Sequence, residues 1–303
     1  MINLLTGIHF LLTYACNFEC EDCFLYCSPK SVGTFKLKQV HQVLDEVVKI
    51  GTIKSIYFEG GEAFLYYPIM IESIKLARER GFKVGIVTNG YWATSIEDAK
   101  IWLKPINEIG ISDISMSDDF FHYGEEGENL SKNAIEAARS LGMPINIICI
   151  DAPKVKLNQE SAQEKGKPVI GGGVMFRGRA VETLTKDLPR RSWKELKECP
   201  YEDLKNLSRV HVDPFGNVHV CQGISIGNMW KTPLSQIISN YDPDSHPICG
   251  PLLRGGPAAL SIEYDLDHKD GYVDECHFCY VSRLSMINKF PEILCPKQVY
   301  GLE

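Results

Sequence analysis

The first two-thirds of the chain alternates short apolar segments with amphipathic segments, and this alternation restricts the fold more than any other feature. Apolar stretches of strand length, such as residues 7–13 and 55–58, are each followed by apolar side chains at helical spacing. Several helical segments end at a glycine, as at Gly51 and Gly81. Such alternation builds a parallel sheet with right-handed crossovers. We therefore expect an α/β fold with six strand–helix units, the sixth strand at 168–176, arranged as a doubly wound sheet or an incomplete barrel.

The composition narrows the class of protein. The chain has 303 residues, a hydrophobic fraction of 44% and a formal charge of −7, so it offers no electrostatic case for a nucleic-acid partner. The apolar N-terminal stretch lacks the basic segment and cleavage site of a signal peptide, and no run reaches the roughly 18 apolar residues of a membrane span. We expect a cytoplasmic protein with no membrane partner.

Polar and glycine-rich motifs follow the predicted strands directly. In parallel α/β sheets, ligand sites gather at the carboxyl ends of the strands. The motifs at these positions are Cys16–Cys23, Gly60–Glu62, Thr88–Gly90 and Ser117–Asp119. Their shared position predicts one site at one edge of the sheet.

The first of these motifs has the spacing C-x3-C-x2-C, formed by Cys16, Cys20 and Cys23, with Cys27 close behind. Eleven cysteines in a chain expected in a reducing compartment favour metal or redox chemistry over structural disulfides. Three thiolates on one loop suit an iron–sulfur cluster with one iron left open for a ligand. Two alternatives remain from spacing: a closed, electron-carrying cluster that includes Cys27, and zinc or spare thiols.

The cysteine motif after the first strand, together with the stretch EGGE at 59–62 after the second, resembles radical SAM enzymes. The resemblance implies a partial (β/α)6 TIM-like barrel and a [4Fe–4S] cluster on Cys16, Cys20 and Cys23 that is chelated by S-adenosylmethionine. It implies reductive cleavage of that molecule to a 5′-deoxyadenosyl radical, which takes a hydrogen atom from a substrate. Cys27 would then be a bystander. The sequence departs from the family's pattern at Asp22, where the residue is often aromatic.

The same resemblance suggests which residues contact S-adenosylmethionine. The GGE segment would contact its amino group, and residues after the third, fourth and sixth strands would contact the nucleoside, the ribose or the methionine carboxylate. The arginine that binds a carboxylate would be one of the two in FRGRA. The candidates are Gly60, Gly61, Glu62, Thr88, Asn89, Ser115, Ser117, Asp118, Arg177 and Arg179.

A second group of cysteines lies in the last third of the chain. Cys199 precedes a hairpin predicted over 209–221, Cys221 closes that hairpin, and Cys276 and Cys279 form a CxxC. Four thiolates in this arrangement suit zinc or a closed [4Fe–4S] cluster, and the chemistry alone slightly favours zinc. Their order resembles the SPASM and twitch extensions of radical SAM enzymes, which implies one auxiliary [4Fe–4S] cluster in a small α+β extension.

The predicted organisation is a core at 1–187 and an extension at 188–303, with the charged stretch 151–167 as a surface loop or lid. Two cysteines are left unassigned, Cys249 in sequence of flexible character and Cys295, and they are candidate hydrogen-atom donors. The alternatives for each are an inert thiol, a replacement for one of the four auxiliary ligands, or a contact to a second cluster. Cys149, in an apolar strand, is expected in the core.

The resemblance favours a peptide or protein substrate, modified by oxidation, cross-linking or epimerisation. A dehydrogenase or rearrangement enzyme acting on a small molecule is the alternative. A more distant one is a non-enzymatic iron–sulfur electron carrier or a zinc-stabilised binding protein. The enzyme would need an external electron donor of flavodoxin or ferredoxin type. Because the first strand begins near residue 7, we expect no leader-binding domain before it, so a peptide would need a separate recognition protein or none.

Overall fold

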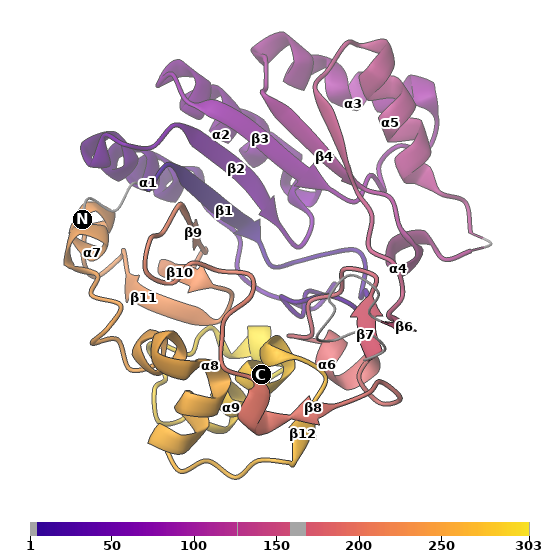
Figure 1. Cartoon of the computed structure of the whole chain (residues 1–303). Coiled ribbons are helices and arrows are strands. Elements are labelled where there is room, and N and C mark those ends of the chain that lie inside the picture. The colour runs from indigo at the N-terminus through magenta and orange to yellow at the C-terminus, as the bar shows by residue number, and fades with distance from the viewer. Residues whose placement is uncertain (1–4, 126, 158–167, 303) are drawn as a thin grey trace. The chain divides into compact units, whose positions relative to one another are not determined.

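The computed structural model describes residues 5–125, 127–157 and 168–302, which form two compact units built from several chain segments (Figure 1). The first unit comprises Met1–Glu19, Cys27–Cys149 and Asn206–Tyr241. The second comprises Cys20–Tyr26, Ile150–Lys205 and Asp242–Glu303. The predicted division into family-type domains at residue 187 stays a prediction, and residues 206–241 pack with the first unit.

The first unit is built on one eight-stranded sheet of order β11-β10-β9-β1-β2-β3-β4-β5. Six adjacent strands of this sheet run parallel to one another, namely β9, β1, β2, β3, β4 and β5. Strand β10 runs antiparallel to both of its neighbours, β9 and β11. The strands are β1 (Gly7–Thr13), β2 (Ser55–Gly60), β3 (Lys83–Thr88), β4 (Asp113–Ser117), β5 (Ile145–Ile148), β9 (Arg209–Val212), β10 (Asn217–Cys221) and β11 (Ile224–Asn228).

The helices of this unit follow the strands in regular alternation. Strands β1 to β5 are neighbours in chain order, and right-handed crossovers without a reversal of direction place every crossover helix on the same face. This arrangement is TIM-like and differs from a doubly wound sheet, whose order reverses. The elements are α1 (Leu37–Ile50), η1 (Ala63–Tyr66), α2 (Tyr67–Glu79), α3 (Ile96–Ile109), α4 (Phe120–Tyr123), α5 (Leu130–Ser140) and α7 (Leu234–Asn240).

The core of the first unit lies between the sheet and these helices. On β1, Ile8, Phe10 and Leu12 are fully buried, and the Phe10 ring packs on those of Phe35 and Phe58. The alternate positions of β1 face the opposite side of the sheet, where His9 is only partly buried. We call the helix-covered side of the sheet its outer face and the other side its inner face. The outer face holds the apolar core, and the inner face carries His9 beside the buried Leu11.

The predicted sixth strand does not join this sheet. Instead, β7 (Pro168–Gly171) pairs antiparallel with β6 (Lys154–Leu157) in a separate two-stranded ribbon. The sixth parallel strand is β9, which pairs with β1 at the other edge. The predicted loop at 151–167 is thus partly strand, and its residues 158–167 lie outside the described ranges.

The predicted hairpin at 209–221 is confirmed, with Val218 opposite Val212. Its place in the main sheet, where it adds strands beside β1, was not expected. The turn between its strands is closed by Asp213, whose carboxylate accepts hydrogen bonds from the backbone N–H groups of Phe215 and Asn217, both at 2.9 Å.

The second unit combines strands of two to four residues with helices of up to 15 residues. Two cysteine predictions are corrected: Cys249 is fully buried at the start of a helix rather than in a flexible segment, and Cys149 is exposed just after β5 rather than in the core. The elements not yet named are α6 (Ala180–Thr183), β8 (Arg191–Ser192), η2 (Trp193–Glu195), α8 (Cys249–Glu263), β12 (Gly271–Tyr272), α9 (Glu275–Ser285) and η3 (Lys297–Tyr300).

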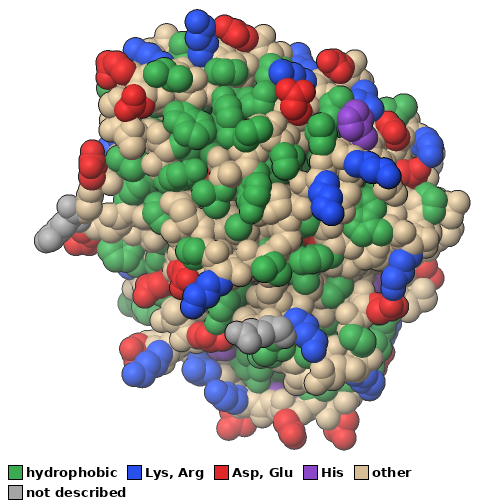
Figure 2. Space-filling model, turned by 180° about the vertical axis from the view of Figure 1, so that it is seen from behind, with side chains coloured by type: hydrophobic (Ala, Val, Ile, Leu, Met, Phe, Trp, Pro, Cys, Tyr) green, Lys and Arg blue, Asp and Glu red, His purple; other side chains and the backbone are tan. Residues whose placement is uncertain are grey.

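On the face that Figure 2 shows, acidic and basic side chains lie among apolar ones. Among the helices of the described residues, none is both long enough and apolar enough to cross a lipid bilayer.

Candidate active site

The cysteine loop begins directly after β1. The backbone N–H of Cys16 donates to the Ser28 carbonyl at 3.1 Å, and this bond fixes the start of the loop. The Cys16 sulfur receives hydrogen bonds from the Phe18 N–H at 3.4 Å and from Asn89 Nδ2 at 3.8 Å. Donors aimed at a sulfur stabilise its thiolate form, which is the form that binds iron.

The other two cysteines of the motif, Cys20 and Cys23, belong to the second unit and lie in one turn, in which the Cys23 N–H donates to the Cys20 carbonyl at 3.2 Å. Arg179 holds this turn at two points. Its Nη1 donates to the Cys20 carbonyl at 2.7 Å, and its backbone N–H donates to the Cys23 carbonyl at 3.0 Å. Both bonds go to backbone carbonyls, so the two sulfur atoms take no part in them.

Gly178 makes this clamp possible. Its φ of +63° is unfavourable for other residues, and a Cβ atom there would lie 2.5 Å from the Cys23 carbonyl oxygen. The neighbouring Arg177 is buried, with its guanidinium over the Phe24 ring at 5.1 Å and its Nη2 3.0 Å from the Met175 sulfur. The FRGRA segment therefore positions the cysteine loop, a role that the sequence did not predict.

The GGE turn lies against the backbone that leads into Cys16. The N–H groups of Gly61 and Glu62 donate to the carbonyls of Thr13 and Ala15 at 2.8 and 2.9 Å. A Cβ atom on Gly61 would lie 2.2 Å from the Ala15 oxygen, and one on Gly60 would lie equally close to the Thr13 oxygen. Only residues without a Cβ allow this approach, which explains the two consecutive glycines.

Glu62 joins the second predicted motif to the third. Its buried carboxylate accepts hydrogen bonds from the N–H of Phe64 at 2.9 Å, the hydroxyl of Thr88 at 2.8 Å and the N–H of Asn89 at 2.7 Å. Burial raises the pKa of Glu62 to about 7, although the three hydrogen bonds favour the ionised form. The carboxyl group is therefore poised to change its charge near neutral pH.

The predicted residues in β4 and directly after it have partners of their own. Asp118 accepts hydrogen bonds from Asn129 Nδ2 at 2.6 Å and from the Ser131 hydroxyl at 3.0 Å, so it stabilises the start of α5. Ser115 donates to the Asp113 carboxylate at 3.0 Å, and Ser117 is buried at the end of β4. The structure thus groups Cys16, Glu62, Thr88 and Asn89 more tightly than it does the β4 residues.

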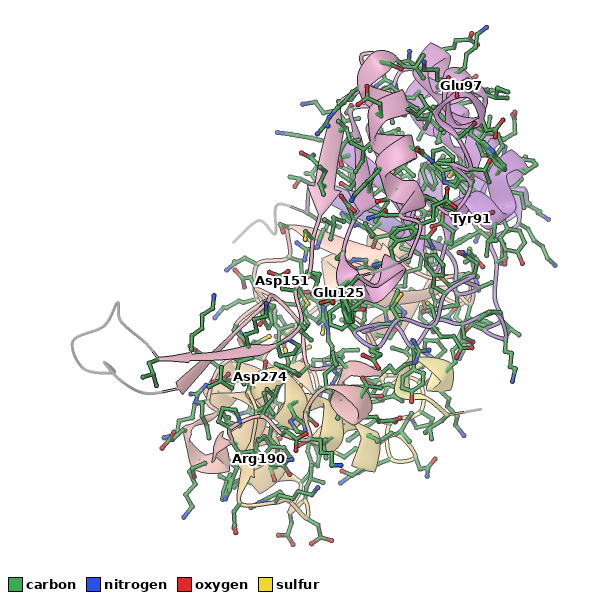
Figure 3. All side chains as sticks on the ribbon, turned by 90° about the vertical axis from the view of Figure 1, so that its right-hand side faces the viewer. Tyr91, Glu97, Glu125, Asp151, Arg190 and Asp274 are labelled. Atoms are coloured by element: carbon green, nitrogen blue, oxygen red, sulfur yellow. The ribbon has the colours of Figure 1, made fainter. Side chains whose placement is uncertain are left out.

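Several residues of this site were not predicted. Asn17 accepts a hydrogen bond from Asn89 Nδ2 at 2.9 Å, and the Tyr123 hydroxyl donates to the Asn89 carbonyl. Tyr91, labelled in Figure 3, has its pKa raised by burial and by the nearby charges of Glu62 and Cys16. Tyr91 directly follows the Thr-Asn-Gly turn, so its position in the sequence was the available signal.

The C-terminal cysteines are divided between the units. Cys221 ends β10 in the first unit, whereas Cys199, Cys276 and Cys279 lie in the second. Cys276 and Cys279 occupy the first turns of α9, which is capped by Asp274 (Figure 3) through a 2.8 Å hydrogen bond from the His277 N–H. Burial raises the pKa of Asp274 to about 6.

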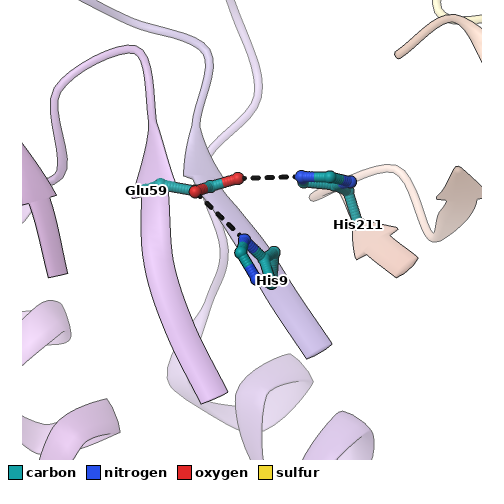
Figure 4. A group of neighbouring side chains, drawn as sticks. All are labelled: His9, Glu59 and His211. Atoms are coloured by element: carbon teal, nitrogen blue, oxygen red, sulfur yellow. Dashed lines mark hydrogen bonds and ion pairs between the residues drawn. The ribbon is translucent and has the colours of Figure 1, made fainter. Parts of the chain in front are cut away.

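One further cluster was missed. His9, Glu59 and His211 come from three neighbouring strands and contact one another on the inner face of the sheet (Figure 4). The signal in the sequence was a polar residue in each of three apolar strands, but only the strand register brings the three together.

Comparison with known proteins defines the class. The family model of the radical SAM superfamily matches residues 10–155, which include the cysteine loop, the GGE turn and the ends of β3 and β4. The residues present fit the cofactors of this family, since three cysteines lie on one loop, two N–H donors point at Cys16, and a glycine turn lies beside it.

Two curated relatives extend the match over most of the chain. The antilisterial bacteriocin subtilosin biosynthesis protein AlbA of Bacillus subtilis (strain 168) is 32% identical over 316 residues, covering 93% of this chain and 68% of its own length. YydG of the same organism, a peptide biosynthesis protein by its name, is 22% identical over 253 residues, covering 82% of this chain and 71% of its own length. The chain belongs to the radical SAM superfamily and is an enzyme that binds a [4Fe–4S] cluster and S-adenosylmethionine.

A solved structure supports the fold. The crystal structure of BtrN in complex with AdoMet and 2-DOIA is 14% identical, with a TM-score of 0.51, and the match covers 79% of this chain and 84% of that one. At this identity the likeness concerns the fold alone, and it agrees with a mostly parallel, TIM-like α/β sheet.

Proposed function

We propose that this enzyme modifies a peptide or protein, by oxidation, cross-linking or epimerisation, after removing a hydrogen atom from it. The observation that carries this proposal is the match to AlbA and YydG, two proteins named for peptide or bacteriocin biosynthesis, over 93% and 82% of the chain. When bound, the [4Fe–4S] cluster and S-adenosylmethionine would supply the chemistry, which is reductive cleavage of S-adenosylmethionine and removal of a hydrogen atom from the substrate.

The residues of the chain have separate roles in this proposal. Cys16, Cys20 and Cys23 hold the cluster, and Arg179 keeps the loop of the last two in place through its bonds to the loop carbonyls. The GGE turn, which ends at Glu62, binds the amino group of S-adenosylmethionine. The remaining cofactor contacts are assigned to Thr88, Asn89, Ser115, Ser117, Asp118 and Arg177.

An auxiliary [4Fe–4S] cluster is assigned to Cys199, Cys221, Cys276 and Cys279. Such a cluster can accept the electron of a substrate radical, which leads to dehydrogenation or cross-linking. A thiol that returns a hydrogen atom would instead lead to epimerisation, and the candidates are Cys249 and Cys295. Cys249 is fully buried, whereas Cys295 is partly exposed and donates to the Glu292 carbonyl at 3.5 Å.

The test measures 5′-deoxyadenosine formed by the reconstituted enzyme with S-adenosylmethionine and a reductant, in the presence of precursor peptides encoded next to its gene. We expect a peptide to stimulate this product and to change in mass or, in deuterated water, to gain one deuterium at a carbon. If small metabolites stimulate 5′-deoxyadenosine formation and peptides do not, the small-molecule alternative replaces the proposal. A flavodoxin or ferredoxin is expected to replace the chemical reductant.

The thiol route is tested with serine variants. In C249S and C295S, loss of deuterium incorporation with retained 5′-deoxyadenosine would identify the donor. If neither substitution changes the stereochemistry or the rate, the thiol route is excluded and the auxiliary cluster remains as the electron acceptor.

A further inference from the structure

The inner face of the sheet carries a row of polar side chains in one register. His211 of β9 is paired with His9 of β1, which is paired with Tyr57 of β2. The rings of His9 and Tyr57 stack with centroids 4.7 Å apart. Burial and the nearby charge of Asp113 on β4 raise the pKa of Tyr57. Gly85 of β3 lies between the last two, and a Cβ atom there would lie 2.2 Å from the Tyr57 ring. This row shows that the inner face is built for polar contacts.

Glu59 lies two residues beyond Tyr57 on the same face and bridges the two histidines (Figure 4). One carboxylate oxygen lies 3.2 Å from His9 Nδ1, and the other lies 3.1 Å from His211 Nε2. These ligand atoms all lie within 4.8 Å of one another. The side chains of His9 and Glu59 are 18% exposed and that of His211 is 6% exposed, so the group is sheltered but reachable.

We propose that His9, Glu59 and His211 form a binding site for a divalent transition-metal ion of the zinc class. Two imidazole nitrogens and one carboxylate are a ligand set that such ions take. With metal–ligand bonds of about 2.0–2.1 Å, neighbouring ligand atoms lie roughly 3.0–3.4 Å apart. One oxygen of Glu59 lies at such a distance from His9 Nδ1, and the other oxygen lies at such a distance from His211 Nε2. The ion would lie between the three side chains.

A simpler arrangement, in which Glu59 accepts one hydrogen bond from each histidine, explains the two short distances. The metal proposal rests on the further observation that one ligand atom from each of the three residues lies within 4.8 Å of the other two.

The ligands come from adjacent parallel strands, which hold them more rigidly than loops would. Three protein ligands also leave a coordination position for water or for a donor atom of a substrate. Glu59 immediately precedes the GGE turn, so this site lies on the same sheet as the cofactor residues of the first unit yet uses no cysteine. The proposal does not depend on the identity of the substrate.

The experiment uses the anaerobically reconstituted enzyme, desalted after incubation with one to two equivalents of Zn²⁺. Zinc, iron and sulfide are counted together, and the zinc environment is measured by X-ray absorption at the zinc edge. We expect about one zinc per chain with full iron, and a shell of nitrogen and oxygen atoms at about 2.0–2.1 Å rather than sulfur at about 2.3 Å. No retained zinc, or zinc with a sulfur shell, overturns the proposal.

Matched variants locate the site. E59Q keeps the shape of the side chain but removes the charge and replaces one accepting oxygen by an NH2 donor. H9Q removes the imidazole of His9, whose side chain is more exposed than that of His211. Each is expected to weaken zinc binding at least tenfold without loss of iron. H41Q, which removes a partly exposed histidine of α1, is the control and should retain zinc. Unchanged zinc binding in both E59Q and H9Q would overturn the assignment. If E59Q fails to fold, unchanged zinc binding in H9Q alone overturns it.

Discussion

At the scale of single residues, Glu62 links the predicted motifs of the first unit to one another through hydrogen bonds. Its carboxylate is buried and accepts three hydrogen bonds, two of them from Thr88 and Asn89 at the end of the next strand. Asn89 in turn donates to the Cys16 sulfur. A charged group placed here connects the GGE turn to the cysteine loop through one side chain.

Glu62 should make the binding of S-adenosylmethionine depend on pH. Because burial raises the pKa of Glu62 to about 7, the carboxylate is ionised above that pH and protonated below it. If it binds the positively charged amino group, affinity is retained above about pH 7 and weakens up to tenfold per unit as the pH falls below it. Equilibrium dialysis at several pH values measures this affinity.

The E62Q variant should bind S-adenosylmethionine about 10–100-fold more weakly than the wild type, with unchanged iron content. Its affinity should not change between pH 6 and 8. Equal profiles for the two proteins would contradict this role.

Arg179 should protect the cysteine loop. In R179Q the hydrogen bond of the guanidinium to the Cys20 carbonyl is lost, while the backbone bond to Cys23 remains. A hydrogen bond from a charged donor is worth about 1.5–3 kcal/mol, so we expect iron to be released to a chelator several-fold faster. R254Q, which removes an exposed arginine paired with Glu263, is the control. Equal release rates in R179Q and the wild type would show that the clamp is unimportant.

At the scale of elements, two contacts decide how the motifs are presented. The GGE turn touches the end of β1 so closely that a side chain cannot be accommodated. The CxxC motif is presented by the first turns of α9, whose N-terminus depends on the Asp274 cap. Backbone geometry in these elements therefore controls the motif residues.

The close approach predicts a difference between two glycine substitutions. G61A places a Cβ atom 2.2 Å from a carbonyl oxygen, whereas G51A adds one in open space at the end of α1, where the positive φ costs about 1–2 kcal/mol. For a chain of this size, about 1 kcal/mol lowers the unfolding midpoint by roughly 2–4 °C. We expect the unfolding midpoint of the reconstituted enzyme to be lowered by about this amount in G51A and by at least twice as much in G61A. Thermal unfolding measures both. A smaller loss for G61A would mean that the turn can move away from β1.

The cap of α9 should matter for the C-terminal cluster. D274A loses the acceptor for the His277 N–H, at a cost of about 0.5–2 kcal/mol, and loosens the turns that hold Cys276 and Cys279. We expect D274A to lose part of its iron on gel filtration, whereas D274N keeps an acceptor and should retain it. Similar iron contents in the two variants would show that the cap does not support a cluster.

At the scale of the whole molecule, the cysteines assigned to metal fall into two groups far apart in the sequence. We predict about eight irons per chain after anaerobic reconstitution, from two [4Fe–4S] clusters, with about four lost in the Cys16/Cys20/Cys23→Ala triple variant. Iron and acid-labile sulfide analysis measures both. About four irons plus one zinc bound through sulfur in the wild type would identify the C-terminal group as a zinc site instead.

The radical SAM class and the α/β alternation were predictable from the sequence because both depend on short-range patterns. A parallel strand is apolar along its length, a helix repeats at 3.6 residues, and a metal loop keeps its ligands within a few positions. The grouping of Glu62 with Thr88 and Asn89 was also foreseeable, since parallel strands end at one edge of the sheet.

Tertiary structure alone decided the features that depend on strand pairing. Residues 168–171 pair with β6 rather than β5, and β9 takes the edge beside β1, because pairing depends on which edges lie within reach and not on local propensity. Cys149 is exposed for the same reason, since it follows an edge strand. Arg179 and the His9–Glu59–His211 group likewise gain their roles from partners 50 to more than 150 residues away. The sequence by itself determined the radical SAM class, because the cysteine and GGE motifs that carry the resemblance are local in the chain. The register of the sheet determined which distant side chains share its inner face.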